Sequence, residues 1–585
     1  MLAYRTPGVY FEWLDQRGPA MAPLRTDIAG FVGIAMAGPL HIPVKIESFT
    51  QFVSIFGGHT PQGFLAYAVE GFFANGGQTC WIVRVADPDP KSTRAASVVV
   101  EDVNEKPALR LSAVSRFSRS DGTADKKPNR GRRGEDITFR LTTTAPDRFT
   151  LIVSLDNTRE IWRDLSLSSG DARNAKDLIN DPSSGSRLVE IEILSSTPTF
   201  PLDVVGRLKD GSDGLRTLKI DHFTGTSMPG PEAGGLAALE LIDEISIVAI
   251  PDIMRKPPVT PHETKPRPPD CNFLNRDEFK KLSEKPLQWQ TRDCCRPEIE
   301  AAALPAEERQ QEMPRAFSRE EVQELQRALI AHCERLKDRV AVLDTPLVDP
   351  ATGEEMTPDL AKSWRLGLDT KYGALYFPWL RVPDPLQLEG QLRSIPPSGH
   401  VAGIYAKGDR LIGVHKPPAN EELESVKDVQ VVLDDIAHGA LNDAGINVIR
   451  DYRGRGVRVA GARTLSSDTE WRYVNVRRLL IMIEEAIDEQ TQWTVFEPNN
   501  PDVWRSIDRV VRAFLDRLWR RGMLDGATPD AAYSVRCDEA TNPPEETARG
   551  RVICEVGVLP PWPAEFVVVR IGRTEGATEI LERET

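Results

Sequence analysis

The stretch GLAALELIDEISIVAIPD, residues 235–252, decides the fold class of this chain. Its first half has the apolar spacing of a helix, and the run ISIVAI at residues 245–250 is typical of a buried strand. Far downstream, Ser318 and Glu321 match a capping box, which predicts a helix to about Lys337 and then the strand RVAVLD at residues 339–344. Strand, helix and strand in this order form a parallel crossover, so we expect an α/β (α+β) core.

The N-terminal part has the same texture. DIAGFVGIAMAG, at residues 27–38, predicts a buried strand, and Ser48 and Gln51 match a capping box that starts a helix to Phe56. GFLAYAVEGFFANGG, at residues 63–77, predicts a second helix with a double-glycine stop, and TCWIVRV, at residues 79–85, a strand. We expect residues 27–95 to be the first part of the core.

Residues 96–221 differ, because short β-like runs alternate there with polar loops. They predict an inserted β-rich domain on the surface. One segment, DGTADKKPNRGRRGED, carries five cations that could bind phosphate, although a charge run of this kind is more often a solvated hairpin loop. These cations are Lys126, Lys127, Arg130, Arg132 and Arg133. Residues 254–315 are rich in Pro and charge with little periodicity, and we expect a surface insertion there.

The last third contains two predicted amphipathic helices. One is RYVNVRRLLIMIEEAIDEQTQW, residues 472–493, and the other is DVWRSIDRVVRAFLDRLWRRGML, residues 502–524. The second helix has a continuous apolar face and an opposite face rich in arginine. The apolar face comprises Trp504, Ile507, Val511, Phe514, Leu515 and Leu518. Upstream, YGALYFPWL predicts a strand that ends at Pro378, and GRGVRVAG, at residues 454–461, predicts a tight turn between strands.

Composition limits the function classes. A chain of 585 residues predicts about three or four domains. The formal charge of −14 argues against nucleic acid as a partner. No apolar run reaches the length of a membrane span, so we expect no direct membrane insertion, and the first residues lack the apolar region of a secretory signal. Seven cysteines favour a reducing cytoplasm over a disulfide framework.

Catalytic signatures are absent from the sequence: there is no P-loop, H-E-x-x-H pair, G-x-S-x-G elbow or kinase set. Ser398 and His400 place a hydroxyl near an imidazole but lack a third orienting group. His262, Cys271, Cys294 and Cys295 could in principle bind zinc, but their spacing is irregular. His332 falls inside a predicted helix and is expected in the core or an interface. We therefore expect no catalytic residue, no metal and no cofactor.

Both chain ends carry an isolated strand pattern. TPGVYFEW, at residues 6–13, precedes a tether from Leu14 to Arg25, and AEFVVVRIG, at residues 564–572, follows PPWP. A strand that finds no local partner can be added to the edge of another sheet, where main-chain hydrogen bonds hold it. When extended, the tether spans up to roughly 40 Å, enough to reach a neighbouring subunit. The alternative is that each terminal strand joins its own domain.

Several stretches in this order resemble the contractile tail sheath proteins of bacteriophages and phage-like injection systems. The resemblance covers residues 6–85 and 235–572, apart from 254–315, and only TREIWRDLS in the β-rich part. It is carried by TPGVYFEW, GGQTCWIVRV, GGLAALELIDEISIVAIPD, YGALYFPWLRVPDP, PPSGHVAGIYAKGD, HKPPANEEL, LNDAGINVIRDYRGRGVRVAGARTLSSDTEWRYVNVRRL, FEPNNPDVW and PAEFVVVRI.

The resemblance implies a structural subunit that polymerises as stacked hexameric rings around an inner tube and contracts to drive the tube through a target envelope. It implies three kinds of partner: other copies of the chain, the inner tube protein, and baseplate and terminator or cap proteins. It also implies assembly in the cytoplasm, into a phage tail or a phage-like particle. The alternatives are another structural component, associated with the baseplate or tube, and an α/β enzyme.

The resemblance also implies that terminal strands are exchanged between subunits, through Val9, Tyr10, Phe11 and Trp13 and through Phe566, Val567, Val568 and Val569. The positive excess on the arginine face of residues 502–521, in an acidic chain, leads us to expect that Arg505, Arg509 and Arg512 contact the inner tube; the alternative is an outward, solvated face. The expected order is an N-terminal arm (1–26), first core segment (27–95), β-rich domain (96–221), α/β core (222–253 and 316–370), insertion (254–315), C-terminal sheath domain (371–563) and C-terminal strand and tail (564–585).

Overall fold

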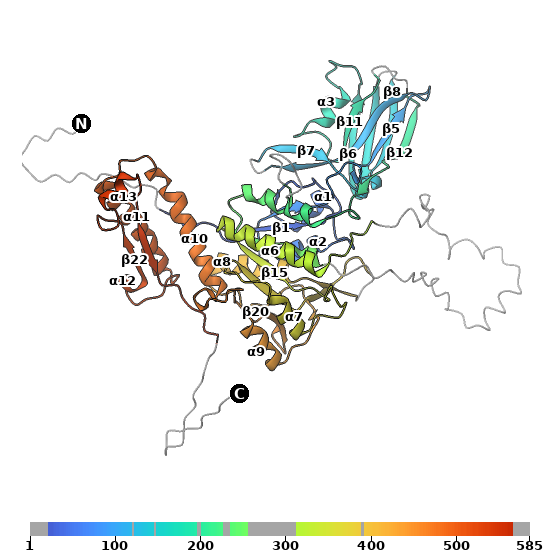
Figure 1. Cartoon of the computed structure of the whole chain (residues 1–585). Coiled ribbons are helices and arrows are strands. Elements are labelled where there is room, and N and C mark those ends of the chain that lie inside the picture. Colours follow the sequence, from blue (N-terminus) through green and yellow to red (C-terminus); the bar gives the residue numbers. More distant parts are fainter. Residues whose placement is uncertain are drawn as a thin grey trace, which may run out of the picture.

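The computed structural model describes residues 21–119, 122–145, 148–195, 200–225, 234–254, 312–387 and 391–565. An eight-stranded sheet lies at the centre, in the order β2-β3-β1-β14-β15-β16-β20-β21 (Figure 1). Only the outermost β2 and β21 run antiparallel to their neighbours. The strands are β1 (Ala29–Gly33), β2 (Val44–Ile46), β3 (Cys80–Arg84), β14 (Ile247–Ala249), β15 (Val340–Asp344), β16 (Gly373–Phe377), β20 (Ile446–Tyr452) and β21 (Gly456–Val459).

The pairing of β14 with β15 confirms the predicted crossover. The two strands are parallel, with Ile247 opposite Val340, and both are buried along their whole length. The capping box is also present: Ser318 accepts from the Glu321 N–H, and the Glu321 carboxylate accepts from the Ser318 N–H. The expected helix before β14 differs, because residues Gly235–Leu241 form a 3-10 helix, η2.

Helices cover both faces of the sheet. The helices around it are α1 (Phe49–Phe56), α2 (Leu65–Ala74), α4 (Ile220–Thr224), η3 (Pro251–Met254), α6 (Arg319–Leu336), α7 (Pro358–Arg365), α8 (Ser398–Leu411) and α9 (Asp435–Asp443). Helix α2 packs on α8, and α6 and α7 are joined through Trp364 and Gln326. Because β1–β3 and β14–β15 cross over in opposite directions, right-handed connections place α2 and α6 on opposite faces.

Residues 96–208 have a hydrophobic core of their own, separate from that of the large sheet. Figure 1 shows them at one end of the molecule, with the C-terminal helices at the other. Two sheets, β10-β9-β8-β12 and β11-β6-β5, enclose this core. The elements are β4 (Thr93–Arg94), β5 (Ser97–Glu101), β6 (Pro107–Ser118), β7 (Ala124–Pro128), η1 (Arg132–Asp136), β8 (Thr138–Ala145), β9 (Arg148–Leu155), β10 (Thr158–Leu165), α3 (Ala175–Asn180), β11 (Val189–Ile193), β12 (Asp203–Arg207) and β13 (Ser212–Asp213).

The C-terminal unit has a third core, built on two long helices. Its elements are η4 (Thr469–Trp471), α10 (Val474–Thr491), η5 (Gln492–Thr494), α11 (Pro501–Arg520), α12 (Pro529–Ala532), β22 (Tyr533–Arg536), α13 (Pro544–Ala548) and β23 (Glu555–Val558). The buried residues of α11 are the six predicted apolar positions, so that helix is confirmed with its face. A small sheet, β18-β17-β19, packs into the core of the large sheet and comprises β17 (Leu380–Pro383), β18 (Leu392–Ile395) and β19 (Asp428–Val429).

Three expectations need adjustment. The boundary at residue 370 does not coincide with an end of the large sheet, because β16, β20 and β21 continue it to Val459. The cation-rich segment is not a loop, since β7 and η1 occupy much of it. The tether from Leu14 to Arg25 is shorter than expected, because its last residues, from Met21 onward, pack against the C-terminal unit. The turn predicted in GRGVRVAG is present and joins β20 to β21.

Candidate functional site

The first described residues of the chain, from Met21 onward, are attached to the C-terminal unit. Met21 is 2% exposed and belongs to the core of that unit. The Ala22 N–H donates to Gln490 Oε1 at 2.6 Å, and Gln490 Nε2 donates back to the Ala22 carbonyl at 2.7 Å. Arg517, on α11, donates to the Met21 carbonyl. The chain upstream of Met21 therefore starts from the C-terminal end of α10.

A buried ion pair binds the same N-terminal segment further along, at Thr26. The guanidinium of Arg478, on α10, donates to both carboxylate oxygens of Asp409, on α8, at 2.9 and 2.5 Å. Both side chains are about 95% buried or more. Arg478 also donates to the Thr26 carbonyl at 2.8 Å, and the Thr26 hydroxyl donates to Asp409 at 2.8 Å. Burial raises the pKa of Asp409, and the neighbouring guanidinium opposes that shift.

The C-terminal segment is fastened at the other end of α10. Arg463 donates to both oxygens of Glu565, at 2.8 and 2.6 Å, and this bidentate bond lowers the pKa of Glu565. Trp562 stacks edge-on against Tyr473, with ring centroids 5.6 Å apart. From Tyr473 to Gln490 the helix rises about 25 Å. We call these two attachments the N-terminal root and the C-terminal root, and α10 separates them.

The sheet of β22 and β23 has two edges. In an antiparallel pair, positions that bond across the pair alternate with positions whose N–H and C=O point outward. The Leu559 N–H donates to the Ala532 carbonyl at 2.8 Å, and Ser534 lies opposite Gly557. The outward positions are therefore Tyr533 and Val535 on β22, and Val556 and Val558 on β23. Two strands alone make a marginal sheet, so this one is suited to accept another.

The predicted tube-contact arginines have different environments. All three lie on the exposed side of α11. Arg505 pairs with Asp502 at 2.6 Å. Arg512 pairs with Asp508 at 2.9 Å and donates to the outward carbonyl of Val535, so it lies over the β22 edge. Among the described residues, Arg509 has no hydrogen-bond or ion-pair partner, and it is the arginine most available to a partner.

The cations of the β-rich region do not converge on one ligand. Lys126, on β7, donates to the Ile179 carbonyl, and burial lowers its pKa to about 8. Arg130 donates to the Pro88 carbonyl at 3.1 Å. Arg133 pairs with Asp136 and Asp156. These side chains hold local structure and do not form a phosphate site.

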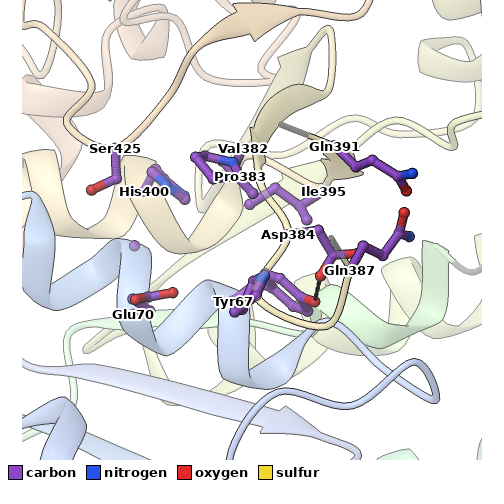
Figure 2. Close-up of a pocket in the computed structure, with 12 residues that line it drawn as sticks. Tyr67, Glu70, Val382, Pro383, Asp384, Gln387, Gln391, Ile395, His400 and Ser425 are labelled. Carbon is purple, nitrogen blue, oxygen red and sulfur yellow. Dashed lines mark hydrogen bonds between the residues drawn. The ribbon is translucent and has the colours of Figure 1, made fainter. Parts of the chain in front are cut away.

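Ser398 and His400 do not form a nucleophilic site. Ser398 is fully buried, and Nδ1 of His400 lies against Gly71 of α2, where an added Cβ would approach it to 2.2 Å. His400 lines a cavity of about 480 Å³ with Tyr67, Glu70 and Asp384 (Figure 2). Tyr67 donates to Asp384 there at 2.7 Å, and burial lowers the pKa of His400 to about 4. The cavity lacks an exposed hydroxyl or thiol activated by a base among the described residues.

Asp344, at the end of β15, has a pKa well above the ordinary value for an aspartate. It is fully buried, which raises its pKa to about 7, and its Oδ1 accepts from the Ser398 N–H at 2.8 Å. Because this pKa lies above the ordinary 3.8, the folded protein keeps a proton that the unfolded chain releases. The free energy of unfolding should therefore fall as pH rises from about 4 to 7.

The substitution Asp344→Asn tests this pH dependence. An asparagine oxygen still accepts from the Ser398 N–H, and its amide can donate to the Ser398 hydroxyl, which has no partner among the described residues. Urea unfolding at pH 4.5 and 8 should show that the variant loses less stability than the wild type, by on the order of 2–4 kcal/mol. Equal losses of stability in the variant and the wild type between pH 4.5 and 8 would contradict the raised pKa of Asp344.

The other histidines and cysteines singled out in the sequence do not form a site among the described residues. His332, 4% exposed on α6, lies in the core as expected. His262, Cys271, Cys294 and Cys295, and the strand-exchange residues Val9, Tyr10, Phe11, Trp13, Phe566, Val567, Val568 and Val569, lie outside the described residues. Within the described ranges, no group of three or more His, Cys, Asp or Glu side chains could hold a metal ion. Nor is any described helix long and apolar enough to cross a membrane.

Two family models match consecutive parts of the chain and meet between β21 and α10. The phage tail sheath protein central domain matches residues 313–465, and the phage tail sheath C-terminal domain matches residues 466–573. Residues 313–573 belong to the phage tail sheath family. The C-terminal match contains α10, α11, the β22–β23 sheet and Glu565 of the C-terminal root.

Relatives and solved structures agree with this assignment. The chain is 26% identical, over 42% of its length, to a prophage major tail sheath protein of Pseudomonas aeruginosa strain UCBPP-PA14, and 24% identical, over 44%, to the tail sheath protein of Salmonella phage ViI. It spans 60% and 42% of these relatives. Its fold matches the anti-feeding prophage helical sheath in the contracted state (TM-score 0.52, 19% identity, 97% of this chain and 99% of that one). It also matches a sheath tail protein of Desulfitobacterium hafniense (0.50, 14%, 91% and 93%).

The two roots could not be located from the sequence. The tail sheath resemblance implied terminal arms, but Thr26, Asp409 and Arg478 are 383 and 69 positions apart along the chain. A charged residue inside an otherwise apolar helical face was the available signal. Arg477 and Arg478 interrupt the apolar face of α10, and both are buried.

Proposed function

We propose that this sheath-family chain is the structural subunit of a contractile sheath, polymerising as stacked hexameric rings around an inner tube. Contraction of the sheath would drive the tube through a target envelope. The observation that carries the proposal is the attachment of both chain ends to α10, the N-terminal segment at Gln490 and the C-terminal segment at Tyr473; α10 lies inside the part of the chain that matches the sheath C-terminal domain. Such a subunit contacts its neighbours through different surfaces, and contacts of this kind build open helices.

In this proposal each subunit lends its ends to its neighbours. Segments containing Val9–Trp13 and Phe566–Val569 would add to an adjacent copy as strands, and the β22–β23 sheet is the receiving sheet that the described geometry favours. Main-chain bonds would give the affinity and alternating side chains the register. Gln490, at the C-terminal end of α10, and Arg478, near its N-terminal end, both hold the N-terminal segment, so a pull on that arm would pass along α10 toward the C-terminal root.

The partners follow from the same proposal. They are other copies of the chain, the inner tube protein, and baseplate and cap proteins, with assembly in the cytoplasm. The anti-feeding prophage baseplate in its contracted state also contains a chain of this fold (TM-score 0.53, 18% identity). Helix α11 would face the tube, with Arg509 as its central contact and Arg505 and Arg512 beside it.

Charge reversal on α11 tests both the assembly and the tube contact. Electron microscopy of the chain mixed with its tube protein should show hollow, striated cylinders. The triple variant R505E, R509E and R512E should reduce co-assembly at least about tenfold, because like charges facing each other across an interface cost several kcal/mol. R509E alone should give most of this loss, since the partners of the other two arginines are intramolecular.

The matched control is R520E, a reversal at an exposed arginine of the same helix that pairs with Asp516. It should co-assemble like the wild type. Normal cylinders from the R509E variant would show that Arg509 does not contact the tube. Discrete particles from the wild type would contradict the proposed sheath function itself.

A further inference from the structure

Cys537 follows the last paired residue of β22, and Cys554 precedes the first paired residue of β23. The last pair of that ladder is Arg536 opposite Glu555, so the next residues on the two strands are the two cysteines. Both thiols are free in the structure. If the alternation of the ladder is extended by one pair, the Cα atoms of Cys537 and Cys554 take the closer spacing, about 4.5 Å, which lies within the range of disulfides, and the two thiols are in hydrogen-bonding contact.

Asn542 holds the two chain segments together at this point. It is 2% exposed and its side-chain amide lies between the segments. Nδ2 donates to the Ile553 carbonyl at 2.9 Å and contacts Cys537 Sγ at 3.9 Å, while Oδ1 accepts from the Ile553 N–H at 2.6 Å. Residue 554 is therefore fixed next to Cys537 by bonds that do not depend on the sulfur atoms.

Burial makes the thiols of Cys537 and Cys554 slow to react, but that of Cys554 is partly exposed. Burial raises the pKa of both thiols, that of Cys554 to about 12; the neighbouring Cys537 raises the pKa of Cys554 further, whereas the hydrogen bond with Cys554 lowers that of Cys537. Cys537 is buried, whereas Cys554 is half-buried and can be reached by a small reagent. Cys80 and Cys333 are fully buried in the main core.

We propose that Cys537 and Cys554 form a reversible disulfide that closes the base of the β22–β23 sheet when the protein meets an oxidising solution of small disulfides. The half-buried Cys554 thiolate attacks one sulfur of the external disulfide, which forms a mixed disulfide and releases one thiolate. Cys537 then attacks Cys554 Sγ, which forms the protein disulfide and releases the second thiolate. The protein loses two electrons and two protons, and the external disulfide leaves as two thiols.

The proposed Cys537–Cys554 disulfide would affect assembly because it lies in the proposed receiving sheet. This consequence rests on the proposed function. In a reducing cytoplasm the dithiol form would persist. Outside the producing cell, the disulfide would close residues 537–554 into a loop and hold the two strands in register. A sheath built from reduced subunits would thus gain a stiffer receiving sheet after its release.

Peptide mapping of the full-length chain tests the proposal. The chain is incubated with glutathione buffers from reducing to oxidising, alkylated, digested and analysed by mass spectrometry. We expect a Cys537–Cys554 linked peptide with the loss of two hydrogens in more than half of the molecules at the oxidising end. The unfolding temperature of the C-terminal unit should rise by at least about 5 °C.

Two further variants make the result interpretable. C537S should leave Cys554 as a mixed disulfide with glutathione and abolish the thermal shift. The variant C271S, C294S and C295S removes three of the other cysteines and should pair normally. Alkylation of both thiols under oxidising conditions, glutathione on each of them, or pairing elsewhere would overturn the proposal. Because linkage is measured on the isolated chain, it is independent of sleeve formation, which electron microscopy reports separately.

Discussion

Replacing Asp409 by alanine is expected to lower the free energy of unfolding by about 3–5 kcal/mol, the cost of leaving a buried charge without its partner. The guanidinium of Arg478 is 3% exposed and would lose both bonds to the carboxylate. The Thr26 hydroxyl would lose its acceptor too. Chemical denaturation of the purified subunit measures the change.

An exposed ion pair provides the matched control. Arg110 and Glu192 pair at 2.5 Å on the surface of the β-rich region, with 42% and 59% of their side chains exposed. Glu192→Ala should cost about 0–1 kcal/mol, as is usual for surface pairs. A similar cost for the two variants would mean that the N-terminal root is not a stabilising unit. Hydrogen exchange should also show faster opening of residues 22–28 in Asp409→Ala.

Much of the architecture could be predicted because its signals are local or periodic. The capping box at Ser318 and Glu321 and the apolar stripe of α11 both lie within a few turns of chain. The buried runs at residues 245–250 and 339–344 fixed a parallel pair, because such runs need cover on both faces. The predicted domain boundary at residue 370 falls inside the large sheet. The sequence could not show this, because sheet order is set by packing between segments far apart in sequence.

The places where the chain ends are attached could not be predicted from the sequence. The terminal strand patterns and the tail sheath resemblance led us to expect exchanged ends, which stays a prediction, and nothing in residues 14–25 indicated that Met21 fills an apolar site between α10 and α11. Likewise, the arginine face of α11 was predicted, but the bond from Arg512 to the Val535 carbonyl depends on where β22 packs. Long-range pairings of this kind follow from tertiary packing and leave no periodic trace in the sequence.

The geometry explains how a lattice could deform and stay connected. In the proposed sheath, both chain ends are attached to one helix, α10, and would pair with the receiving sheet of a neighbour. A subunit could then rotate against its neighbours while main-chain bonds keep them joined. Each arm would act as a second attachment of high effective concentration, and an edge with free N–H groups is what such an arm needs.

Blocking that edge should stop polymerisation. The Val558 N–H points outward from β23, and Val558→Pro removes this donor, whereas Val558→Ala removes two side-chain carbons and keeps the donor. Proline is tolerated on the free edge of a strand, so the isolated subunit should fold. We expect the proline variant to form no sleeves by electron microscopy under conditions in which the alanine variant forms them at close to the wild-type yield.

The donor side offers an independent check of the same pairing. A chain that lacks residues 1–15 keeps Met21 and both roots, so its unfolding should resemble that of the full chain. If the first residues are the donated strand, the truncated chain should fail to build sleeves, as the proline variant does. Combining the two changes should add nothing, because both remove one bond network. Full-length, contractile sleeves from either single variant would mean that the β23 edge and the N-terminal segment do not meet, and that the lattice is held by other contacts.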